Sequence, residues 1–243
     1  MMSLIKADLA EILKKQYFFK FKANIDVFSS LVGLQLLAVL FSLGGGMYTG
    51  YYGGGMDISM KLYSADMVIL FTMIWALITS VTITTKPYRN YEFTFVTNRI
   101  SSSLSNILFL LTISLLAGFT SMLSANLIHV LVYFFIDSGM LIYEQHMQDI
   151  ITGVISTSLY IFLFCSFGYL FGAFIQVHKV FSGLIPVGII GLLLFDGMKL
   201  NSTIAMFYFN EPSLFMFFIK TIILAGIAFA VAILILRNME VKR

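Results

Sequence analysis

Six long apolar runs separated by short polar connections constrain this chain more than any other feature. They lie at about 27–44, 66–85, 104–127, 151–176, 180–195 and 214–236. A helix needs roughly 20 apolar residues to cross a membrane, and backbone groups in lipid must bond within their own segment. The runs also lack the alternating polarity of barrel strands. The sequence therefore predicts an all-α membrane protein with about six transmembrane helices, forming a single domain over residues 1–243.

Two of the runs depart from an ideal span. The third continues as far as Ile136, which is too long for one straight crossing, so we expect a bent extension or an outer helix after Leu127. The fifth is short and contains Pro186. The stretch at 196–213 that follows it contains an apolar segment, which predicts either an outer loop or a re-entrant element before the last span.

Composition supports the same class of protein. The chain is 59% hydrophobic and 11% charged, whereas a soluble domain has about 25% charged residues. A net charge of +3 gives no indication of nucleic-acid binding. A single cysteine, Cys165, excludes a disulfide framework, and no His/Cys spacing typical of a metal site occurs, so we expect no metal.

Basic residues are distributed unevenly over the predicted connections. Cytoplasmic connections normally carry the excess of Lys and Arg, so the unequal distribution orients the chain. If the N-terminus is cytoplasmic, twelve of the 15 Lys and Arg residues fall on the cytoplasmic side. The other three, Lys61, Lys199 and Lys220, fall on the outer side. We therefore expect a multi-pass protein of the cell membrane with both termini in the cytoplasm.

The first 26 residues combine charges with aromatic rings and precede the first span. Rings and lysines together suit the headgroup region of a membrane, where anionic lipid is present. Residues 1–26 are therefore predicted to form an interfacial helix, which could also contact a cytoplasmic partner. The residues expected at the membrane interface are Tyr17, Phe18, Phe19, Lys20 and Lys22.

The connection at 86–103, between the second and third runs, mixes charges with aromatic residues in a way that a solvated loop does not need. Such a segment is typical of a knob that inserts into a groove on another protein. The alternative is that its rings lie in the headgroup zone. The residues expected to dock are Tyr88, Arg89, Tyr91, Glu92, Phe95 and Arg99.

This layout resembles the permease subunits of ABC-2-type exporters. The local match is Glu92 followed by Thr97-Asn98-Arg99, with Val96 where the family has proline. The resemblance implies that 86–103 holds a coupling helix that docks on a separate ATPase, and that a second permease copy, identical or different, completes the transporter. It also implies export of an amphipathic or hydrophobic substrate, such as a peptide, lipid or drug-like molecule.

The chain has no Gly-x-x-x-x-Gly-Lys-Ser/Thr motif, so ATP and Mg²⁺ would be bound by the partner subunit. We expect no catalytic residue and no cofactor in this chain. Two other classes remain open: a non-transporting immunity, sensing or assembly protein, and an ion-coupled secondary transporter. The spans carry no charged residue near their middle, which argues against the latter.

Three further features predict local structure. Gly168 and Gly172 form a Gly-x-x-x-Gly pair that favours close helix packing, within one chain or across a dimer. Gln35 is the strongly polar residue of the first run and is expected to bond neighbouring helices. The glycine-rich segment 44–65 is expected to be a flexible linker, with an outer gate as the alternative.

Overall fold

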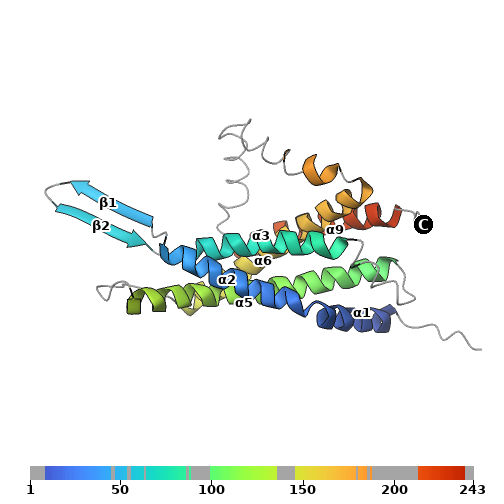
Figure 1. Cartoon of the computed structure of the whole chain (residues 1–243), viewed down its shortest axis with the longest axis horizontal. Helices are drawn as coiled ribbons and strands as arrows, with labels where there is room; N and C mark the ends of the chain where they lie inside the picture. Colours follow the sequence, from blue (N-terminus) through green and yellow to red (C-terminus); the bar gives the residue numbers. More distant parts are fainter. Residues whose placement is uncertain are drawn as a thin grey trace, which may run out of the picture.

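Among the residues that the structure describes, five apolar helices form a bundle, with a short helix at one end and a β-hairpin at the other (Figure 1). A computed structural model describes residues 9–44, 47–53, 56–62, 64–85, 88, 99–135, 146–178, 180–184, 187 and 213–238. The elements are α1 (Leu9–Ala23), α2 (Ile25–Gly44), β1 (Met47–Gly53), β2 (Met56–Leu62), α3 (Asp66–Thr84), α5 (Arg99–Phe135), α6 (Met147–Val177) and α9 (Leu214–Asn238).

Helices α2, α3, α5, α6 and α9 are each long and apolar enough to cross a membrane, so this is a multi-pass membrane protein. Their bounds agree with five of the six predicted runs to within a few residues, except that α5 is much longer than expected. The predicted fifth run, 180–195, lies mostly outside the described residues, as does the segment 196–213.

Helix α6 is the centre of the bundle and packs against α3, α5 and α9, while α2 packs on α3 and α5. Side chains of all five of these helices fill the core, and the Tyr169 ring on α6 lies 5.7 Å from the Phe229 ring on α9. The outward faces carry exposed Leu, Ile and Phe side chains, which in a membrane would contact lipid. Core members include Trp75, Phe109, Ile113, Ile161, Tyr169 and Phe229.

Helix α5 corrects the prediction of a span followed by a bent extension. It runs without interruption over the 37 residues Arg99–Phe135. This stretch contains no proline, and its one glycine, Gly118, is packed closely against Ser158 of α6. At about 1.5 Å per residue the helix is about 55 Å long, well beyond the roughly 30 Å of a hydrocarbon core. One or both of its ends therefore extend outside the lipid interior.

A β-hairpin lies where the sequence predicted a flexible linker, while the rest of the described chain is helical or connects helices. Strands β1 and β2 are antiparallel, with Met47 opposite Leu62 and Gly53 opposite Met56. Tyr, Thr and Ile favour strands, and two glycines between two such runs are typical of a hairpin. The hairpin projects beyond the bundle at the end opposite α1 (Figure 1).

Candidate functional site

Helix α1 is attached to the start of α5 through a buried lysine. The Lys20 side chain is only 6% exposed. Its Nζ donates hydrogen bonds to the carbonyl oxygen of Ser102 at 3.0 Å, to Oγ of Ser105 at 2.6 Å and to Oδ1 of Asn106 at 2.5 Å. Hydrogen bonds from a charged donor are about twice as strong as neutral ones, so this contact fixes α1 on α5.

Lys20 thus differs from its predicted place among lipid headgroups. Gln16, Lys20 and Asn24 recur every four residues, so they share one face of the helix, and all three are buried. The facing part of α5 is rich in buried serines, of which Ser105 accepts a hydrogen bond from Lys20. The 16/20/24 spacing was readable in the sequence, but only the structure shows that this polar face turns inward.

The opposite face of α1 exposes several of the residues that the sequence predicts for the membrane interface. Phe18 is 53% exposed and Phe21 is 37% exposed, with Lys22 exposed beside them. Phe19 is 39% exposed and Tyr17 is partly buried. Helix α1 therefore turns its rings and Lys22 outward and its polar stripe toward the protein.

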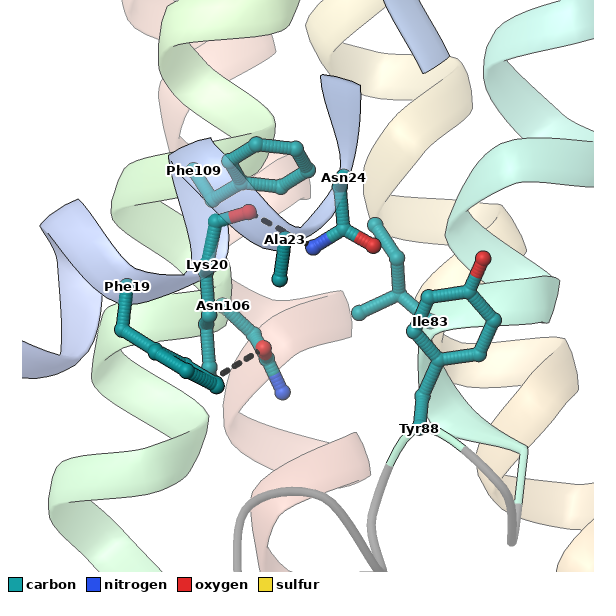
Figure 2. Close-up of a pocket in the computed structure, with 8 residues that line it drawn as sticks. All are labelled: Phe19, Lys20, Ala23, Asn24, Ile83, Tyr88, Asn106 and Phe109. Carbon is teal, nitrogen blue, oxygen red and sulfur yellow. Dashed lines mark hydrogen bonds between the residues drawn. The ribbon is translucent and has the colours of Figure 1, made fainter. Parts of the chain in front are cut away.

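A cavity of about 320 Å³ lies beside Lys20, where α1, α3 and α5 meet (Figure 2). Three aromatic rings and Ile83 supply its apolar surface, and two asparagines with Lys20 supply its polar surface. Pockets of this size with a few polar groups among apolar walls are typical of small-ligand sites. The lining residues are Phe19, Lys20, Ala23, Asn24, Ile83, Tyr88, Asn106 and Phe109.

The predicted docking segment adjoins this cavity near its start. Tyr88 is partly buried and contributes to the cavity wall next to Ile83, the penultimate buried residue of α3 (Figure 2). Arg99 is the first residue of α5. The remaining members, Arg89, Tyr91, Glu92 and Phe95, lie outside the described residues.

Gly168 and Gly172 lie at the contact between α6 and α3 within one chain. A Cβ on Gly168 would be 2.5 Å from the carbonyl oxygen of Leu77, and one on Gly172 would overlap the Thr84 side chain. Only glycine allows the two helices to approach this closely. These two glycines therefore help to fix where the end of α3, and with it Tyr88, is placed.

Gln35 joins three helices near the middle of the bundle. Its Nε2 donates to Oγ of Ser121 at 3.1 Å and reaches Oγ1 of Thr72 and the carbonyl oxygen of Ala117, each at 3.4 Å. All of these contacts are buried, as expected of a polar residue that bonds neighbouring helices in lipid. The cluster connects α2, α3 and α5, and its members bond one another.

No cluster of His, Cys, Asp and Glu that could hold a metal ion occurs among the described residues. Comparison with models of known families, with curated proteins and with solved structures finds no match to this chain. The geometry of the α1 end of the bundle is therefore the basis for the functional argument.

Proposed function

We propose that this chain is the membrane-spanning permease subunit of an ATP-driven ABC exporter, resident in the cell membrane. A separate ATPase would dock on the segment 86–103, and a second permease copy would complete the transporter. Both termini would be cytoplasmic, with six crossings in all. The substrate would be amphipathic or hydrophobic, because the chain offers apolar and aromatic surface rather than charge.

The course of α6 and α9 supports six crossings. The Tyr160 ring lies 4.7 Å from the Phe217 ring, and the Tyr169 ring lies 5.7 Å from the Phe229 ring, so the two helices run in the same direction. A chain that leaves the end of α6 must therefore return to the opposite end of the bundle before α9 begins. The apolar run at 180–195 lies in that connection.

The observation that carries the proposal is the arrangement around the cavity beside Lys20. The segment 86–103 leaves α3 at this cavity and returns as the start of α5, whose Ser105 and Asn106 hold Lys20. A partner that moved this segment would act on α1, α3 and α5 together. Because α5 is one continuous helix, the movement would reach the end of the bundle nearest the hairpin.

The translocation path would form between two copies of the chain. Within one copy, the described helices pack around an apolar core that includes Trp75, Phe109 and Ile161. ATP binding would close the ATPase dimer and shift the permease pair between inward and outward states, which is an alternating-access mechanism.

Co-purification with a cytoplasmic ATPase and reconstitution into liposomes test the proposal. Glu92→Lys and Arg99→Glu should each lower transport-coupled ATP hydrolysis while leaving the chain folded, because they reverse charges at the proposed docking surface. Lys22→Glu is the matched control, since Lys22 is an exposed charge on α1 outside that segment. If both docking variants keep wild-type binding and turnover, the docking assignment is wrong. Transport driven by an ion gradient without ATP would refute the exporter proposal itself.

A further inference from the structure

The two asparagines of the cavity beside Lys20 have orientations that their partners dictate. Lys20 Nζ can only donate, so the atom of Asn106 that faces it, 2.5 Å away, must be the oxygen Oδ1. The backbone carbonyl of Lys20 can only accept, so the atom of Asn24 that contacts it at 2.8 Å must be the nitrogen Nδ2.

One polar atom of each asparagine is left over for a ligand. Asn106 keeps its Nδ2 amino group as a donor and Asn24 keeps Oδ1 as an acceptor, and neither atom bonds another residue in the described structure. Figure 2 shows the Asn106 nitrogen directed away from Lys20 and the Asn24 oxygen directed toward Ile83. The cavity thus offers a donor and an acceptor between apolar walls.

The surroundings indicate where such a ligand would come from. Phe19 and Ala23 line the cavity and are exposed, so it opens beside the outward face of α1. That face carries Phe18, Phe21 and Lys22, a combination suited to the headgroup level of a membrane. No carboxylate is among the described residues that line the cavity, whereas a lysine is.

We propose that this cavity binds the headgroup and glycerol end of an anionic membrane lipid that carries free hydroxyls. Asn106 Nδ2 would donate to a phosphoryl oxygen, and Asn24 Oδ1 would accept from a headgroup hydroxyl. The cavity, at about 320 Å³, is large enough for the polar end alone, so the acyl chains would lie in the bilayer beside α1. The bound lipid would lie beside the hydrogen bonds of Lys20 that join α1 to α5. This lipid site does not depend on the proposed transport function.

Native mass spectrometry of the purified chain, with phosphatidylglycerol and phosphatidylcholine of the same acyl chains, tests the proposal. One phosphatidylglycerol per chain should bind about tenfold more tightly than phosphatidylcholine. Asn106→Asp keeps the acceptor for Lys20 but replaces the donor with a carboxylate oxygen, so phosphatidylglycerol affinity should fall about tenfold or more. Ala23→Trp should have the same effect by filling the cavity. Lys14→Ala, which removes an exposed charge of α1 outside the cavity lining, should bind nearly as wild type.

Several results would overturn the assignment. Equal affinity for the two lipids would do so, as would wild-type binding by Ala23→Trp. If Lys14→Ala lost as much phosphatidylglycerol affinity as Asn106→Asp, the preference would come from the surface charge of α1 and not from the cavity. Displacement of the lipid by micromolar sn-glycerol 3-phosphate would assign the site to a soluble phosphate instead. Because Cys165 is buried, its protection from maleimide shows whether each variant is folded. If Asn106→Asp does not fold, the lipid affinity of Ala23→Trp alone tests the site.

Discussion

Replacing Gly168 with alanine would place a methyl group 2.5 Å from the carbonyl oxygen of Leu77 and 2.8 Å from Cβ of Ser80. Ordinary van der Waals contact begins at 3.4 Å, so α3 and α6 would have to separate by roughly 1 Å. A backbone carbonyl cannot move aside as a side chain can. Overpacking of this kind costs about 1–3 kcal/mol, and the better helix propensity of alanine offsets up to about 1 kcal/mol. Because the clash is with backbone, the cost lies near the upper end of that range, and we expect a net loss of about 2 kcal/mol in the free energy of unfolding.

Two glycine positions in the same bundle provide graded controls. A Cβ on Gly226 of α9 meets nothing within 4 Å, so Gly226→Ala should be neutral or stabilise by up to about 1 kcal/mol. A Cβ on Gly153 would meet the terminal methyl of Met122, a flexible group that can move, so Gly153→Ala should fall between the two. All three changes add the same methyl group to a membrane helix and differ in what that methyl meets.

The sole cysteine of the chain provides the assay. Cys165 is fully buried on α6, and its Sγ lies 4.0 Å from the carbonyl oxygen of Ala76 on α3, across the contact that the Gly168 methyl would open. When opening is fast, the rate of maleimide labelling follows the population of the open state. A loss of about 2 kcal/mol should raise that rate about 30-fold. Equal labelling rates for Gly168→Ala and Gly226→Ala would refute the argument from close packing.

Three further predictions concern polar groups elsewhere in the chain. A double-mutant cycle of Gln35→Leu with Ser121→Ala should give a coupling energy of about 0.6 kcal/mol, and at most about 1.7 kcal/mol, because the 3.1 Å hydrogen bond between the two side chains is buried between helices. A coupling energy of zero would contradict this hydrogen bond. The only tryptophan, Trp75, is 5% exposed, so aqueous iodide should quench its fluorescence weakly in the folded protein, and strong quenching would exclude this position. The pKa of Glu11 lies below its ordinary value of 4.5 because Lys15 bonds its carboxylate at 2.7 Å. The contact therefore stabilises α1 fully above pH 4.5, and this stabilisation is lost as the pH falls through the lowered pKa. A carboxyl titration by NMR should show a midpoint that rises toward 4.5 in Lys15→Met, and an unchanged midpoint would contradict the pairing.

Four of the five described spans could be predicted from the sequence to within a few residues at each end. The first run was placed at 27–44 and α2 occupies Ile25–Gly44, while the last was placed at 214–236 and α9 occupies Leu214–Asn238. The many glycines of 44–65 favour a flexible linker, which is why the hairpin does not follow from composition alone. Its alternating Tyr, Thr and Ile residues around two glycines were nevertheless a readable signal.

The candidate site depended on information that no local pattern contains. Lys20 looked like a headgroup lysine because its neighbours are aromatic, yet its polar stripe meets the serine-rich start of α5, more than 80 residues away. Likewise, the Gly-x-x-x-Gly pair predicts a close helix contact at Gly168 but does not identify the partner, which is Leu77 on α3.

The sequence by itself determined which of the described segments are able to cross a membrane, because the transfer of a run of about 20 apolar residues into lipid depends on that run alone. Only the tertiary structure decided which faces meet, and so where the buried lysine, its cavity and the glycine contact lie. Between helices in lipid there is little hydrophobic driving force, and the pairing is set by shape and hydrogen bonding across residues distant in the chain.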